Sequence, residues 1–178
     1  EAFHTFAQRS FARYPGLQAM LLGLRMPDAR WEAHTQAVRP KGVGDLQSVE
    51  QTVQGATVQA GQHPQDIAVT YLEPRAENEA TFGFDVLAVP DSLEAMQQAR
   101  DTGQPQATGR LTLGQDPGRH FVLLVFLPLY DSALPPAPVE ERRRNLHGYI
   151  TGMFQIGNMV EAALQGLKQA GIVLRIED

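Results

Sequence analysis

Apolar side chains recur at helical spacing along residues 1–14. Polar residues fill most of the remaining positions, and Pro15-Gly16 ends or kinks the segment. The pattern predicts an amphipathic helix whose apolar stripe packs either on the protein core or, as a stalk, against a second copy of the chain. This stripe consists of Phe3, Ala7, Phe11 and Tyr14.

The pattern is weaker between residues 17 and 66. Residues 17–24 are apolar enough for a buried strand or for a continuation of the helix, and periodicity does not separate the two at this length. Pro27-Asp28 opens a second predicted helix, which continues through Val38. Residues 45–67 alternate valine and glutamine without a clear period.

Short strands and two helices are predicted in the rest of the chain. Pro90-Asp91 begins a helix with Asp91 as its cap, and Gly103 ends it. Asn158 is the predicted cap of a last helix, and a turn over 115–118 joins two strands as a hairpin. Strands are predicted at 67–72, 82–89, 110–113, 120–129, 146–156 and 172–176. These elements predict an α+β fold with a mostly antiparallel sheet.

Composition narrows the expected partners. The formal net charge is −5 and no long run of lysine or arginine occurs, so nucleic acid is not an expected partner. The chain has no cysteine, which excludes disulfides and thiolate metal sites. The basic cluster Arg142-Arg143-Arg144 directly follows two glutamates, which predicts a solvated turn in which Arg143 or Arg144 holds the loop.

Motifs for catalysis and metal binding are missing from the sequence. The five histidines show no metal-ligand spacing, and no nucleophile elbow, phosphate-binding loop or dinucleotide fingerprint occurs. We therefore expect a binding protein rather than an enzyme, with no metal and no cofactor. An enzyme would require a catalytic pair of carboxylates in a cleft, and the sequence points to no such pair.

Asp85 is the one charged residue in the predicted strand 82–89, which is otherwise apolar on both faces. A buried carboxylate needs hydrogen-bonding partners, because an unpaired internal charge costs several kcal/mol. Its partners could come from the chain itself, through Arg110, Thr102 or backbone amides. Alternatively, its hydrogen-bonding capacity is kept for a ligand. Gly148 and Gly152 likewise leave room on one strand face for a ligand or for close packing.

Six short fragments, in order along the chain, resemble the CHASE domain, the extracytoplasmic sensor of many bacterial receptors and of plant cytokinin-receptor histidine kinases. The fragments are Tyr71-Leu72-Glu73-Pro74, Gly83-Phe84-Asp85, Ala99-Arg100-Asp101-Thr102-Gly103, Arg110-Leu111, Leu127-Pro128-Leu129-Tyr130, and Gly148-Tyr149 with Phe154.

The resemblance implies a single CHASE-like sensor domain over residues 1–178. Residues 1–66 would form a stalk helix and N-terminal elements, 67–156 a PAS-like ligand-binding part, and 157–178 a C-terminal helix and strand. It also implies a periplasmic domain of an inner-membrane receptor, with membrane helices on both sides and a histidine kinase or diguanylate cyclase beyond. A homodimer through the N-terminal helix would be the signalling unit.

The resemblance also implies a small-molecule site, with a flat N-heterocycle as one candidate ligand. Asp85 would accept hydrogen bonds from the ligand, Thr102 matches the threonine of an acid-Thr-Gly motif, and the loop near Ala107 would supply backbone groups. The apolar walls and floor would come from Phe126, Leu127 and Gly152. The chain departs from the family at Leu93, where arginine is common, and at Phe126, where the plant receptors have threonine.

A second function fits the same sequence. A PAS-like module could serve as a dimerisation or protein-contact unit and bind no small molecule. The behaviour of Asp85 separates the two hypotheses, because only a ligand-binding sensor would lose a ligand response when this carboxylate is removed.

Overall fold

The computed structural model describes residues 2–25, 52–53, 56–57, 67–74, 90–112, 121–131 and 138–165. The elements, in chain order, are α1 (Ala2–Arg13), β1 (Leu17–Arg25), β2 (Thr52–Val53), β3 (Ala56–Thr57), β4 (Ile67–Glu73), α3 (Pro90–Thr102), β5 (Gln106–Ala107), β6 (Leu111–Thr112), β7 (Phe121–Tyr130), α4 (Val139–Arg144), β8 (Leu146–Gln155) and α5 (Ile156–Leu164). None of the helices in these ranges is both long enough and apolar enough to cross a membrane.

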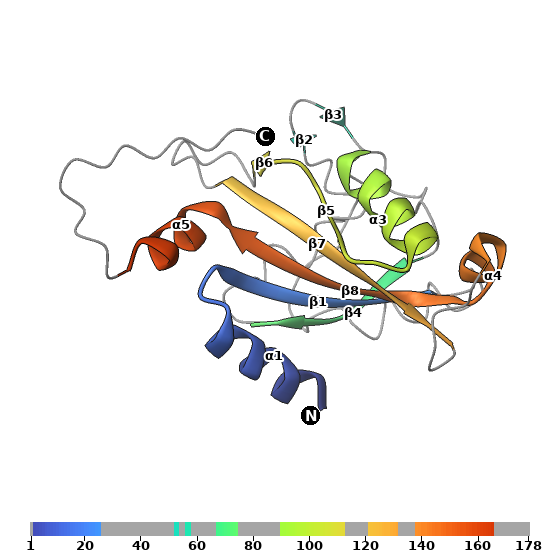
Figure 1. The fold of residues 1–178 in the computed structure, drawn as a ribbon, viewed down its shortest axis with the longest axis horizontal. Coiled ribbons are helices and arrows are strands. Elements are labelled where there is room, and N and C mark those ends of the chain that lie inside the picture. The colour runs from blue at the N-terminus through green and yellow to red at the C-terminus, as the bar shows by residue number, and fades with distance from the viewer. Residues whose placement is uncertain are drawn as a thin grey trace, which may run out of the picture.

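The main sheet is antiparallel, with the strand order β4-β1-β8-β7-β5, and β6 also pairs with β7 (Figure 1). Strands β2 and β3 form a separate two-stranded hairpin. The sequence left residues 17–24 open between strand and helix, and the structure makes them the strand β1. Because β1 lies between β4 and β8, the N-terminal part of the chain is integral to the same sheet as the segment 67–156.

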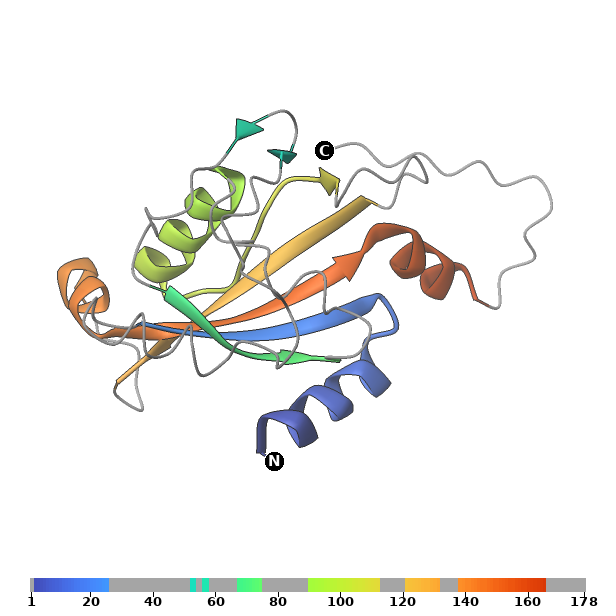
Figure 2. The same ribbon diagram turned by 180° about the vertical axis from the view of Figure 1, so that it is seen from behind.

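Two helices cover opposite faces of the sheet. Helix α3 lies on one side and α1 on the other, as both views show (Figures 1 and 2). We call these sides the α3 face and the α1 face. Buried residues of the α3 face include Ala19, Leu21, Leu124, Phe126 and Met153. The apolar cluster of the α1 face contains Leu17, Met20, Ile150 and Phe154.

The apolar stripe of α1 is mostly core. Ala7 is fully buried, and Phe3 and Phe11 pack with it against Leu17 and Met20 of β1. The stripe therefore attaches the helix to the sheet of its own chain. Tyr14, the last member of the predicted stripe, is instead half-exposed at the end of the helix.

Several sequence predictions are confirmed, among them the α+β class, the helix that begins at Pro90, and the hairpin of β6 and β7. Three predictions were wrong. Asp91 is not the cap of α3, because the helix begins at Pro90 and Asp91 lies inside its first turn. The basic cluster forms the last turn of the short helix α4 rather than a solvated turn. Asn158 lies inside α5, which begins at Ile156 after a cap position at Gln155. The following predicted elements lie outside the described residues: the helix over 27–38, the strands 82–89 and 172–176, and the turn 115–118.

Candidate functional site

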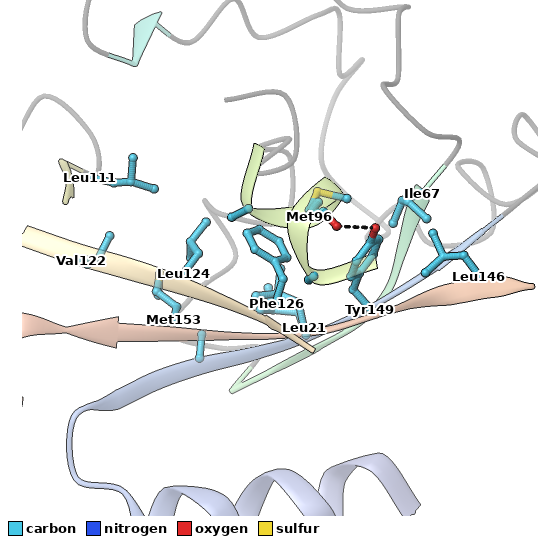
Figure 3. Packing of buried hydrophobic residues seen from close by; sticks show 14 residues of the cluster. Leu21, Ile67, Met96, Leu111, Val122, Leu124, Phe126, Leu146, Tyr149 and Met153 are labelled. Atoms are coloured by element: carbon cyan, nitrogen blue, oxygen red, sulfur yellow. Dashed lines mark hydrogen bonds between the residues drawn. The ribbon is translucent and has the colours of Figure 1, made fainter. Parts of the chain in front are cut away.

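The centre of α3 packs on the sheet through Phe126 and Tyr149. Their rings meet edge to face, with centroids 6.1 Å apart. The Tyr149 hydroxyl donates a hydrogen bond of 3.0 Å to the Met96 carbonyl oxygen of α3 (Figure 3). Burial raises the pKa of the Tyr149 hydroxyl, so it stays a neutral donor. These contacts fix the middle of the helix over β7 and β8.

Side chains from β7 and α4 cap the C-terminal end of α3. The Tyr130 hydroxyl donates a bond of 2.6 Å to the Arg100 carbonyl oxygen, and Arg142 Nε donates one of 2.8 Å to the Asp101 carbonyl oxygen. Gly103 follows with φ 73°, and its amide donates to the Ala99 carbonyl oxygen at 2.8 Å. Carbonyl groups at this helix end lack intrahelical partners, so these donors satisfy them.

The Asp101 carboxylate joins α3 to α4. Arg100 Nε donates to Oδ1 at 2.6 Å, while Arg143 donates through Nε to Oδ1 at 3.0 Å and through Nη2 to Oδ2 at 2.6 Å. These charge-assisted bonds hold the pKa of the Asp101 carboxyl well below its usual range. Arg143, one of the clustered arginines, thus joins α4 to the last turn of α3.

Thr102 has a local structural role in the folded chain. Its exposed hydroxyl donates to the Gln98 carbonyl oxygen at 2.7 Å and accepts a 3.2 Å bond from the Gln104 amide. Together with the Asp101 interactions and the left-handed Gly103, this explains the Asp-Thr-Gly fragment as a helix terminus. A ligand contact by Thr102 remains a proposal.

The predicted wall residues lie on two faces of the sheet. Phe126 is fully buried beneath α3, whereas Leu127 alternates to the α1 face and is exposed. Ala107 is paired with Val125, and Val125 with Gly152, so these three positions also belong to the α1 face. The side chains of Phe126 and Leu127 therefore cannot line one cavity together. On the α3 face, Leu127, Ala107 and Gly152 could contribute only backbone groups.

Asp85 lies outside the described residues. The structure does describe Thr102 and Arg110, the two side chains that the sequence suggested as partners of Asp85 within the chain. The Thr102 hydroxyl is engaged with the backbone of its own helix end. The Arg110 guanidinium lies over the Phe121 ring, 4.9 Å from its centroid.

The two glycines of β8 are explained by close packing. A Cβ atom on Gly152 would lie 2.9 Å from the Phe154 ring and 3.2 Å from Leu17 Cδ1. A Cβ atom on Gly148 would meet the backbone of β1. The sequence left two explanations open for these glycines, room for a ligand and close packing. The contacts at both positions support close packing.

No sequence pattern singled out Ser92. A serine in the first turn of a helix is usually explained as part of the cap. Here Ser92 is fully buried, and its Oγ is the one buried side-chain polar atom without a hydrogen-bond partner in the described part of the chain. In the same part of the chain, no group of three or more metal-ligating side chains occurs.

Comparison with protein-family models gives a match to the CHASE domain. The match covers residues 1–178. It confirms the resemblance carried by the six ordered fragments, and the described helices and antiparallel sheet are consistent with this family.

Proposed function

Because the chain belongs to the CHASE domain family, whose members are extracellular sensor domains of receptors, we propose that it binds a small molecule through Asp85 on the α3 face. The family match over the whole chain carries this proposal. Along the sequence, Asp85 precedes Pro90, the first residue of α3, by five positions. Five steps of fully extended chain span at most about 18 Å, which sets the upper limit on the distance between the Asp85 and Pro90 Cα atoms.

The chemistry around α3 favours an apolar ligand with a few polar groups. Met96 and Phe126 supply buried apolar surface on this face. A carboxylate accepts hydrogen bonds, so the ligand must present N–H or O–H groups to Asp85. A flat N-heterocycle meets both conditions.

The receptor context is part of the proposal. The domain would lie in the periplasm, between membrane helices that flank this chain, with a histidine kinase or diguanylate cyclase as the output domain. Ligand binding would favour one arrangement of the sheet and α1 over another, because a ligand shifts an equilibrium only by binding one state better.

Helix α1 is the proposed dimer contact. The apolar stripe of α1 packs against the sheet of its own chain. Phe6, however, is 46% exposed, on the side of the helix that does not face the sheet. On the adjacent edge strand, Tyr71 is 52% exposed and lies against Phe3, with ring centroids 5.8 Å apart. These aromatic rings give a second copy of the chain an apolar surface to bury.

Replacing Phe6 by serine is expected to weaken the dimer about tenfold, since burying the exposed part of this ring contributes roughly 1–2 kcal/mol. Sedimentation equilibrium over a range of concentrations measures the dissociation constant. The control is Gln8→Ser, because Gln8 is also exposed on α1. A purely monomeric wild-type chain, or equal dissociation constants for Phe6→Ser and wild type, would argue against this contact.

Asp85→Ala is expected to abolish stabilisation by ligand. In a thermal-shift screen with nucleobase-like and amine compounds, a ligand at about 100 times its dissociation constant should raise the Tm of the wild type by about 5–10 °C. The control is Asp131→Ala, because Asp131 is an exposed acid just after the end of β7 that pairs with the exposed His147. A ligand response that survives in Asp85→Ala would show that this carboxylate is not the anchor.

The alternative function is a PAS-like module for dimerisation or protein contact, without a small-molecule ligand. The tight contact of Phe126, Tyr149 and Met96 beneath α3 favours it. Under this alternative, no compound in the screen raises the Tm, and Asp85→Ala changes only the basal stability.

A further inference from the structure

Ser92 is buried without a hydrogen-bond partner among the described residues. The residue is 0% exposed, and no acceptor or donor in the described ranges contacts its Oγ. A hydroxyl placed in this way loses its bonds to water and gains none in return, which destabilises the fold. Such groups in native structures call for an explanation, and one explanation is a binding role.

The hydroxyl lies on the inner side of the first turn of α3. Ser92, Met96 and Ala99 follow one another at helical spacing, and all three are fully buried. The side chain of Ser92 therefore points toward the same face of the sheet as that of Met96. Ser92 is therefore the member of this buried set that lies nearest the N-terminal end of the helix.

The backbone of this turn adds further donors. The amides of Asp91, Ser92 and Leu93 have no carbonyl partner within the helix, and Pro90 has no N–H group. The opposite end of α3 contrasts with this one, because side chains from β7 and α4 satisfy carbonyls there. In the first turn of α3, the buried Ser92 hydroxyl thus lies beside backbone donors that have no partner within the helix.

We propose that the Ser92 hydroxyl and the neighbouring first-turn amides form a second polar contact of the ligand site. This inference rests on the proposed function and specifies the ligand further. Ser92 and the amides would donate to an acceptor on the ligand, while Asp85 would accept from a donor on it. The expected ligand class is a neutral heterocycle that carries both a hydrogen-bond donor and a hydrogen-bond acceptor, such as a ring with an amino group and an unprotonated ring nitrogen.

An anionic ligand fits this turn less well, although a helix N-terminus generally favours negative charge. Asp91 lies in the same first turn and Glu94 follows it, so these two carboxylates would repel a negatively charged ligand. A ligand acceptor that carries no formal charge avoids this repulsion and still uses the amide donors.

The test compares Ser92→Ala with Ser10→Ala. The control is matched, because the Ser10 hydroxyl in α1 already donates to the Phe6 carbonyl oxygen at 3.0 Å. Without ligand, Ser92→Ala is expected to raise the Tm by about 2–4 °C, since it removes an unsatisfied hydroxyl. Ser10→Ala removes a satisfied bond, so any rise in its Tm comes from the helix propensity of alanine alone and should be smaller than that of Ser92→Ala.

Ligand affinity is measured by calorimetry with adenine, cytosine and nicotinamide as probes. For any probe that binds the wild type, Ser92→Ala is expected to weaken binding about five- to tenfold, and Ser10→Ala should leave binding unchanged. A lower Tm for ligand-free Ser92→Ala would show a structural role and overturn the inference. Full affinity in Ser92→Ala with loss in Asp85→Ala would overturn it while the proposed function stands. If none of the three probes binds the wild type, both the heterocycle assignment and this contact are rejected.

Discussion

Gly148→Ala is expected to destabilise the domain by at least about 3 kcal/mol, because the added methyl group has no space in the sheet. The new Cβ atom would clash with the Gly23 carbonyl oxygen and would lie 2.9 Å from the Leu24 Cα atom. Both obstacles are backbone atoms of β1, which pairs with β8 along its length. Relief of the clash requires the two strands to separate, and this costs ladder hydrogen bonds at the centre of the sheet.

Urea unfolding followed by circular dichroism measures this loss. Gly157→Ala is the control, since a Cβ atom at Gly157 meets nothing within 4 Å and the residue lies in α5. An alanine in a helix is usually more stable than a glycine, so this variant should be neutral or slightly stabilised. Similar unfolding midpoints for the two variants would mean that β1 and β8 do not approach as closely as described.

Asp101→Asn is expected to destabilise the domain by about 1–2 kcal/mol at neutral pH. The neutral amide cannot accept two charge-assisted bonds from Arg143, and it leaves Arg100 without its carboxylate partner. The expected loss of unfolding free energy is no larger because Arg143 is half-exposed and solvent screens its charge. The substitution weakens the contact between α3 and α4, two helices that lie far from β1 in the sequence.

The effect of Asp101→Asn should depend on pH with a definite sign. The pKa of Asp101 is lower in the folded state than the ordinary value of 3.8, because Arg143 and Arg100 stabilise the carboxylate. Its contribution is therefore complete above about pH 4 and is lost as the pH falls toward the folded-state pKa. The stability difference between wild type and Asp101→Asn should be constant from about pH 7 to 5 and should shrink below about pH 4.

Urea unfolding at several pH values tests this dependence. The control is Asp131→Asn, because Asp131 is exposed and its carboxylate pairs with the exposed His147 at 2.8 Å. This variant should change stability by less than about 0.5 kcal/mol at neutral pH. A constant difference between wild type and Asp101→Asn down to about pH 2 would contradict the assigned role of the carboxylate.

The sequence by itself determined the features that depend on neighbouring residues. The spacing of Phe3, Ala7 and Phe11 fixed the helix α1, and Pro15-Gly16 fixed its end. Proline at the start and a left-handed glycine at the end delimited α3. Such signals act within one or two turns, so they can be recognised without a fold. The ordered family fragments extended this local information to the domain type.

Tertiary structure alone decided which segments pair and which faces they bury. Residues 17–25 became a strand because β4 and β8 satisfy both of its edges, and these partners lie far away in sequence. Strand alternation and pairing separated Phe126 from Leu127, so the candidate site residues lie on two faces of the sheet. The burial of Ser92 likewise depends on how α3 is placed over the sheet. Burial and hydrogen-bond satisfaction arise from non-local contacts, and a sequence pattern does not contain those contacts.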